Sequence, residues 1–405
     1  MSRTGRMAVV AGTLALGLAG GGALGLFAQD QGRTSSGPGV GSPLPSPARP
    51  APPVRLVTPD TLLAWTPGGL PAGLETRVRR LPGIDHVVGV VSGTAWLTRS
   101  FDAAGNTVDR PPRGLAIPIE VAAADLSRYA PFFSPADRAP LQELARGRAA
   151  LGATSAILRR LGPGATLVFG ARKMGVAAIV PDASIGANEA FMSKRAAASI
   201  GLTRARYLLI DPAPRASRER ITAGIRSLLP SGAQLRVRGP GETPFFRQGD
   251  AVLPPVIVKK YFGEFAARPL PTGFLAIDPR WVAEHIVTAA VPILGRVQCN
   301  RALIPQLRGA LSEVAREGLA QLIHPGDYGG CFAPRFINED PTADLSHHSW
   351  GAAIDINVSA NPFGRTPHQD PRVVAAFERW GFTWGGRWLV PDGMHFEFVR
   401  VPSSP

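Results

Sequence analysis

The chain has only two cysteines among its 405 residues, which excludes a disulfide-dense scaffold and any metal site built from a cysteine cluster. Charged residues are also scarce, at 18% against 45% hydrophobic residues, so most of the chain can form packed cores. Only four of the 44 basic residues are lysines, and the arginines are scattered without a basic run. The net charge of +14 therefore does not indicate a nucleic-acid-binding protein, and we expect no nucleic-acid partner.

The longest apolar run lies near the N-terminus, where Met7–Ala28 carries no charged residue. At about 1.5 Å per residue, a helix of this length crosses a hydrocarbon layer of about 30 Å. Arg3 and Arg6 precede the run and favour a cytoplasmic N-terminus. We therefore expect residues 1–28 to form a single-pass transmembrane anchor in the cell membrane, with a short cytoplasmic N-terminus and the bulk of the chain extracytoplasmic. A cleaved signal peptide is the alternative, although Leu26 fits a cleavage site after Ala28 poorly.

Two regions follow this run. Residues 29–54 are rich in proline, serine and glycine, a composition typical of a linker. Residues 55–265 alternate strand-like runs such as His86–Val91 with helix-like stretches, which predicts a mixed α/β domain. Within this domain, Leu141–Arg160 has the spacing of one helix broken into two pieces at Gly152. No chemical site emerges here, so the expected role is that of a spacer or of a domain that binds a protein partner.

Part of this middle domain, Gly147–Val180, resembles the extracytoplasmic domains of bacterial permease-type exporters. The resemblance is carried by the spacing of Gly152, Ala156 and Gly164 before two strands. It implies no activity for the domain.

The first chemical signal is a cluster of histidines, because five of the seven lie between residues 324 and 395. Residues 346–355 fit the pattern S-x-H-x-x-G-x-A-x-D, with His348 and Asp355 as its polar members. Alternation from Ala353 to Val358 predicts a strand with Asp355 on one face. Gly351 permits a turn before the strand that brings His348 back towards Asp355.

A second strand-like run, Met394–Phe398, places His395 on one face and apolar residues on the other. If the two strands are neighbours, His348, Asp355 and His395 converge. Two imidazoles and one carboxylate form a ligand set that suits zinc and leaves a fourth position for water, as in catalytic zinc sites.

Two further residues complete the expected active site. Asp392 lies on a turn just before His395, where it can accept a proton from a metal-bound water and pass it to a leaving amine. Arg335 lies upstream of the histidine motif and can bind a substrate carboxylate or a developing oxyanion. His347 does not have the ligand spacing of His348, so we expect it outside the ligand set.

These motifs, together with Trp384-Gly385-Gly386, resemble the zinc D-alanyl-D-alanine carboxypeptidase family, the VanY-type peptidases that cut peptidoglycan stem peptides. The similarity runs from about residue 270 to residue 400 and assigns residues 266–405 to a peptidase domain. It implies an α+β fold with a central antiparallel sheet. It also implies that His348, Asp355 and His395 bind Zn2+, that Asp392 is the catalytic carboxylate, and that Arg335 contacts the substrate or transition state.

The bond that is cut stays open at this stage. Many members of the family have glutamate at the position of Asp392, and the aspartate form is similar to L-alanyl-D-glutamate endopeptidases. The expected activity is therefore that of a D-alanyl-D-alanine carboxypeptidase, with L-alanyl-D-glutamate cleavage as the alternative. The third alternative is a non-catalytic protein that binds the cell wall or acts as a scaffold. The complete ligand set argues against this alternative.

The two cysteines flank a predicted amphipathic helix with apolar residues at helical spacing between Leu303 and Leu322. A bridge between Cys299 and Cys331 is chemically permitted outside the cytoplasm. We therefore predict a disulfide in the peptidase domain.

Overall fold

The computed structural model describes residues 60–242, 246–251 and 253–400. The predicted membrane anchor and linker, residues 1–28 and 29–54, lie outside these residues. Within the described residues, no helix combines the length and the apolar character needed to cross a membrane. The chain divides into two compact units, residues 1–48 and 49–405, and all described residues belong to the second.

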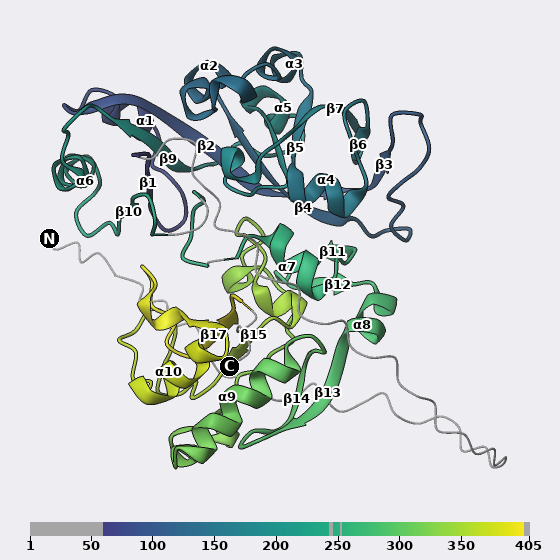
Figure 1. Ribbon diagram of the computed structural model, residues 1–405, viewed down its shortest axis with the longest axis vertical. Helices are drawn as coiled ribbons and strands as arrows, with labels where there is room; N and C mark the ends of the chain where they lie inside the picture. The colour runs from purple at the N-terminus through teal and green to yellow at the C-terminus, as the bar shows by residue number, and fades with distance from the viewer. Residues whose placement is uncertain (1–59, 243–245, 252, 401–405) are drawn as a thin grey trace, which may run out of the picture. The chain divides into compact units, whose positions relative to one another are not determined.

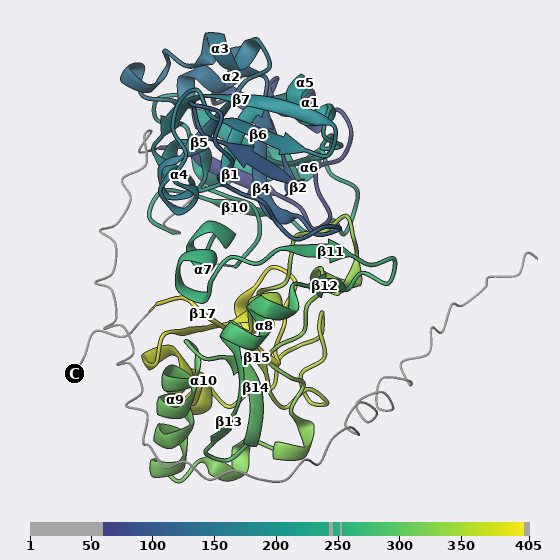
Figure 2. The same ribbon diagram turned by 90° about the vertical axis from the view of Figure 1, so that its right-hand side faces the viewer.

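A ten-stranded sheet dominates the first half of the described chain (Figures 1 and 2). All neighbouring strands are antiparallel except for two parallel pairs, β4 with β8 and β5 with β7. The strands, in their order across the sheet, are β10 (Arg236–Arg238), β1 (Leu62–Trp65), β9 (Ala205–Pro212), β2 (Ile84–Leu97), β4 (Ile117–Ala124), β8 (Ala190–Ser193), β5 (Ala149–Gly152), β7 (Arg172–Val180), β6 (Thr166–Phe169) and β3 (Arg99–Phe101).

Both faces of this sheet are covered by apolar residues. In β4, Val121 and Ala123 pack in one buried cluster while Ala122 and Ala124 pack in another, because successive side chains of a strand point to opposite faces. Short helices accompany the strands: α1 (Leu74–Val78), α2 (Leu126–Tyr129), α3 (Leu141–Ala145), α4 (Ala153–Arg159), α5 (Lys194–Ala198) and α6 (Arg218–Ser227). The predicted strand His86–Val91 lies within β2 and is confirmed.

The prediction of one broken helix over Leu141–Arg160 is wrong. The structure has α3 and α4 there, with the strand β5 between them. All four residues of β5 are buried, between β8 on one side and β7 on the other. A short apolar run fits a buried strand as well as a helix, and burial inside the sheet decides in favour of the strand here.

The remaining residues form a second α+β region (Figure 1). Its central sheet has three antiparallel strands in the order β15 (Ala353–Asp355), β17 (His395–Phe398) and β16 (Phe382–Trp384). Two antiparallel hairpins precede it, β11 (Ala267–Pro269) with β12 (Leu275–Ile277) and β13 (Ile286–Val291) with β14 (Gly295–Asn300). The helices are α7 (Pro255–Phe262), α8 (Pro279–His285), α9 (Ile304–Arg316) and α10 (Pro371–Arg379). The mixed α+β class predicted from the sequence is therefore confirmed.

A single hydrophobic cluster underlies this region. Helix α9 contributes Leu307, Leu311 and Val314 to it at helical spacing, as predicted. Helix α7 packs Val258 and Phe262 into the same cluster, although the predicted boundary at residues 265 and 266 places this helix in the middle domain. The division into domains 55–265 and 266–405 itself stays a prediction.

Candidate metal centre

Two adjacent strands place the carboxylate and one imidazole of the predicted ligand set together. Strands β15 and β17 are antiparallel, and Asp355 lies directly opposite His395 in their register. Ile354 and Phe396 point to the other face, where both join the hydrophobic cluster. The strand ends at Asp355 rather than continuing to Val358 as predicted, and Asn357 turns the chain with a positive φ of 52°.

A capped turn positions the second imidazole. Residues His347–Trp350 form one turn of 3-10 helix, and the Ser346 hydroxyl caps it by accepting a hydrogen bond from the His348 backbone N–H at 3.3 Å. Gly351 ends the turn with φ of 62°, and a Cβ there would lie 2.6 Å from the Asn300 backbone nitrogen. The glycine is therefore required for the chain reversal that returns His348 to Asp355.

The three predicted ligands converge on one point. His348 Nε2 lies 3.1 Å from His395 Nδ1 and 3.2 Å from Asp355 Oδ2. His395 Nδ1 lies 3.1 Å from Asp355 Oδ1. All three side chains are buried. They form a group that can hold a metal ion, with ligand atoms within 4.8 Å of one another.

The donor set fits zinc in spacing. Ligands bound about 2.0–2.1 Å from a tetrahedral zinc ion lie about 3.3 Å from one another, close to the separations of these three side chains. The hydrogen bonds around them also fit. His348 Nδ1 donates to the Cys331 carbonyl oxygen at 2.9 Å, which leaves the lone pair on Nε2. His395 Nε2 faces Glu397 Oε2 at 3.4 Å, so a neutral His395 that donates from Nε2 would present the lone pair of Nδ1 to a metal.

Electrostatics at the centre favour a cation. Burial raises the pKa of Asp355, but the charges and hydrogen bonds of His348 and His395 hold it well below its usual range. Burial by itself lowers the pKa of His395, yet hydrogen bonds to Asp355 and Glu397 raise it overall, to about 10. The two carboxylates therefore stabilise positive charge beside His395.

Asp392 lies next to this centre, where the turn before β17 approaches the end of β16. Gly385 allows the approach, because a Cβ there would lie 2.7 Å from the Asp392 carbonyl oxygen. The Trp384 indole donates to the Gly393 carbonyl oxygen at 2.8 Å and holds the same turn. Within the described chain, Asp392 Oδ1 is buried without a hydrogen-bond partner. Burial raises the pKa of this carboxyl.

Arg335 is held by its backbone. The Ser349 hydroxyl accepts from the Arg335 N–H at 3.0 Å and donates to the Arg335 carbonyl oxygen at 3.0 Å. The positive charge of Arg335 partly offsets the effect of burial on the pKa of Asp392. The two side chains therefore interact electrostatically. Sequence reasoning missed Ser349, whose role depends on a backbone contact that a motif does not encode.

Glu397 links the ligand His395 to a second imidazole. Its Oε2 lies 2.8 Å from His347 Nδ1 as well as 3.4 Å from His395 Nε2. His347 is therefore buried behind the centre and outside the ligand set, as predicted. His324 and His368 are exposed and belong to no metal-binding group within the described residues.

Two aromatic residues border the centre. The Trp388 ring lies 5.1 Å from that of His395, centroid to centroid, which places Trp388 at the wall of the site. Tyr328 lies near Asp355, since burial and then the Asp355 charge raise the pKa of the phenol. Tyr328 was not singled out in the sequence, because no motif joins it to the ligands.

The predicted disulfide between Cys299 and Cys331 is present, with a Cα–Cα distance of 5.3 Å. Cys299 lies in β14, and Cys331 lies in the loop after α9. This loop supplies the carbonyl oxygen that orients His348. The bridge therefore restrains the loop behind the metal centre.

Comparison with known proteins supports the family resemblance of this region. Residues 339–398 match the family model described as D-alanyl-D-alanine carboxypeptidase. The matched segment contains His348, Asp355, Asp392 and His395, while Arg335 lies just before it. A search of curated proteins finds no match.

Solved structures offer weaker similarities. The periplasmic region of MacB from Actinobacillus actinomycetemcomitans has a TM-score of 0.31 and 10% identity, covering 45% of this chain and 90% of that chain. The extracellular domain of the noncanonic ABC-type transporter YknZ from Gram-positive bacteria has a TM-score of 0.29 and 12% identity, covering 44% and 98%. TM-scores this low do not support a structural relationship. The exporter resemblance of residues 147–180 therefore stays a prediction.

Proposed function

We propose that this protein is a zinc peptidase that cleaves peptidoglycan stem peptides, acting as a D-alanyl-D-alanine carboxypeptidase. The observation that carries the proposal is the convergence of His348, Asp355 and His395 beside a buried carboxylate oxygen of Asp392 that has no partner within the described chain. The family match of residues 339–398 supports the same reaction class.

Each side chain has a role in this proposal. His348 Nε2, His395 Nδ1 and one Asp355 oxygen would hold the zinc ion, which when bound acts as a Lewis acid and lowers the pKa of a water molecule. The Asp392 carboxylate accepts the proton of the attacking water and returns it to the leaving amine. Burial favours the first of these transfers, because it raises the pKa of the Asp392 carboxyl and so makes the carboxylate a stronger base.

Arg335 supplies positive charge to the substrate. Within the described chain, its guanidinium group has no hydrogen-bond or ion-pair partner, while its backbone is held by Ser349. A free guanidinium can bind the terminal carboxylate of a stem peptide through two parallel hydrogen bonds. It can equally stabilise negative charge that develops on the substrate carbonyl oxygen.

The setting of the reaction is part of the proposal. We place the peptidase outside the cytoplasm, anchored in the cell membrane by residues 1–28. Residues 55–265 then serve as a spacer or bind a protein partner. The disulfide Cys299–Cys331 supports this placement, because structural disulfides persist in oxidising compartments.

The decisive experiment incubates the purified full chain with a stem pentapeptide, with and without a zinc chelator. Release of terminal D-alanine that stops with the chelator and returns with added zinc is the expected result. Cleavage between L-alanine and D-glutamate would replace the carboxypeptidase by the endopeptidase. If no product depends on metal, the peptidase proposal fails and a non-catalytic wall-binding role takes its place.

A further inference from the structure

A second candidate site lies away from the metal ligands, in a groove of about 610 Å³. One wall is the segment that leads into β4, and the other is β11 with the residues beside it. Four arginines line the groove: Arg99, Arg110, Arg113 and Arg268. Trp96 and Leu115 contribute apolar surface to the same groove. Its lining includes no acidic residue.

The four arginines are exposed and have no ion-pair partner within the described chain. Like charges gathered around one groove repel each other and raise the local concentration of anions. Elsewhere in the described chain, the exposed arginines Arg146, Arg372 and Arg379 pair with a carboxylate. The groove is therefore a basic surface whose counter-charge is not supplied by its own lining.

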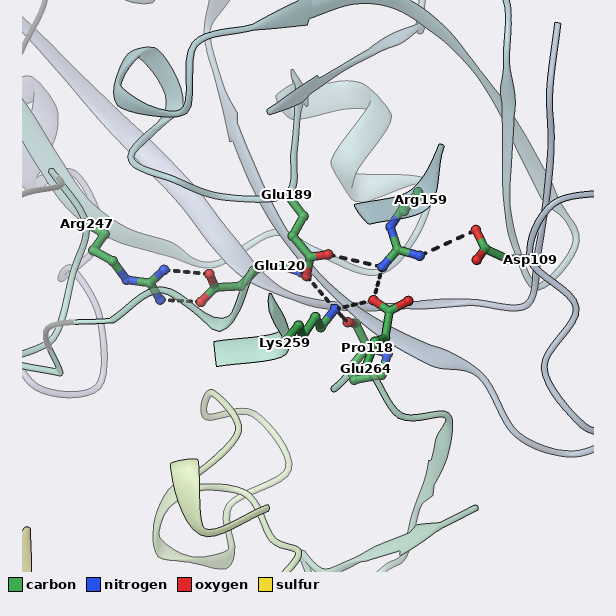
Figure 3. A network of polar contacts seen from close by, with 8 residues as sticks. All are labelled: Asp109, Pro118, Glu120, Arg159, Glu189, Arg247, Lys259 and Glu264. Carbon is green, nitrogen blue, oxygen red and sulfur yellow. Dashed lines mark hydrogen bonds and ion pairs between the residues drawn. The ribbon is translucent and has the colours of Figure 1, made fainter. Parts of the chain in front are cut away.

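Asp109 and Glu264, which precede the two walls in the sequence, are directed into a buried network (Figure 3). Asp109 pairs with Arg159 at 3.4 Å, and Glu264 pairs with both Arg159 and Lys259. Glu189 joins the same network, 3.1 Å from Arg159 and 2.7 Å from Lys259. Arg159 and Lys259 are almost fully buried. These carboxylates are therefore paired with buried cations and with none of the groove arginines.

The same network braces the two walls. Asp109 lies just before the first wall and Glu264 just before the second, and Arg159 contacts both. Ala116 and Ala267 join the walls directly through two backbone hydrogen bonds, of 2.9 and 2.8 Å. Burial raises the pKa of Glu264, but the charges of Lys259 and Arg159 lower it overall, so Glu264 stays ionised in the network. Contacts within the protein thus join the two walls of the groove to each other.

We propose that this groove binds phosphate-bearing anions. Planar guanidinium groups donate paired hydrogen bonds to phosphate oxygens, and arginine is preferred over lysine where such recognition matters. The apolar surface of Trp96 and Leu115 suits the carbon part of a glycerophosphate unit. This unit occurs both as a lipid headgroup and as a soluble molecule, and the groove chemistry is the same for both.

The test measures binding by calorimetry on the full chain in a neutral detergent. The probes are soluble glycerophosphate and micelles of the same detergent containing phosphatidylglycerol, with phosphatidylcholine micelles as the neutral comparison. The groove variant carries Arg99→Gln, Arg110→Gln, Arg113→Gln and Arg268→Gln. We expect its affinity to fall at least about tenfold, the size of one lost charge-assisted hydrogen bond.

A matched control removes the same charge elsewhere. It carries Arg172→Gln, Arg220→Gln, Arg226→Gln and Arg316→Gln, all exposed arginines outside the groove. Its affinity should stay within about twofold, because binding that follows net charge alone would weaken equally in both variants. Thermal unfolding of both variants checks that the fold is retained.

Each outcome decides the proposal. Selective loss of glycerophosphate binding in the groove variant supports a site for free phosphate. Selective loss of phosphatidylglycerol binding alone supports a site for a lipid headgroup. Equal losses in the two variants, no binding of either probe, or equal affinity for an oligoglutamate of similar charge would overturn it. Because no turnover is measured, failure here leaves the peptidase proposal untouched, and failure of that proposal leaves the groove untouched.

Discussion

The Nδ1 atom of His348 lies 2.9 Å from the carbonyl oxygen of Cys331, and Cys331 is covalently bound to Cys299. A ligand histidine is held in one tautomer and orientation by the hydrogen bond of its other ring nitrogen. The carbonyl that makes this bond lies in a loop, and the disulfide ties that loop to β14. The residue that orients His348 is therefore itself one of the two bridged cysteines.

Removing the bridge should weaken both stability and metal binding. For Cys299→Ala with Cys331→Ala, we expect the free energy of unfolding to fall by about 3 to 4 kcal/mol, from the loop that the bridge closes. The Cys331 carbonyl remains but is less well held, so zinc affinity should fall about tenfold. Denaturant unfolding and competition with a chromogenic chelator measure the two effects. Unchanged zinc affinity in a destabilised variant would show that the carbonyl is positioned without the bridge.

The ligand set predicts a sharp contrast among the histidines. His348→Ala or His395→Ala should abolish stoichiometric zinc in the purified protein, because each removes one of three protein ligands. His368→Ala is the matched control, since its side chain is exposed and outside the metal-binding group. Metal content by mass spectrometry is the measurement. Full zinc content in either ligand variant would place the metal elsewhere.

We expect Asp392 to transfer protons and not to bind the metal. Asp392→Asn keeps the shape of the side chain and removes its basicity, so turnover should fall on the order of 10² to 10⁴-fold while zinc content is unchanged. Asp370→Asn is the control, because Asp370 caps α10, where asparagine caps as well, and its carboxylate pairs only with the exposed Arg372. Retained turnover in Asp392→Asn would assign the base to another residue, and loss of zinc would make Asp392 a ligand.

The metal centre could be predicted because its geometry follows from short-range patterns. Alternation alone puts Asp355 and His395 on polar faces, and only the pairing of their strands remained to be assumed. Gly351 signals the turn that returns His348. Helix α10 also follows from a short-range pattern, because Asp370 caps it, Pro371 opens it and Gly381 follows its end.

Features that depend on distant parts of the chain could not be predicted in this way. The run Ala149–Gly152 becomes a strand only because β7 and β8 flank it. The residues of the run do not by themselves distinguish a strand from a helix. The Cys331 carbonyl reaches His348 through a backbone group that every residue carries. The pairing of Arg159 with Asp109 and Glu264 likewise joins segments that are far apart in the sequence.

Kinetics of an Arg335 variant distinguish two roles for the Arg335 guanidinium group. Replacing it in Arg335→Gln should lower kcat/KM about 10²-fold, the loss expected for a charged donor that acts on the reacting group or the substrate carboxylate. A rise in KM with unchanged kcat would assign the guanidinium to the substrate carboxylate, which is bound equally before and during reaction. A fall in kcat with unchanged KM would assign it to the developing oxyanion.

Arg365→Gln is the control for this measurement, because it removes an exposed arginine from the same region without touching the backbone contacts of Ser349. Its kinetics should match those of the unchanged protein. If Arg335→Gln also matched them, the free guanidinium beside Asp392 would have no part in turnover, and its effect on the pKa of Asp392 would be incidental. If both variants lost activity equally, the loss would reflect net charge at the substrate approach and not a contact made by Arg335.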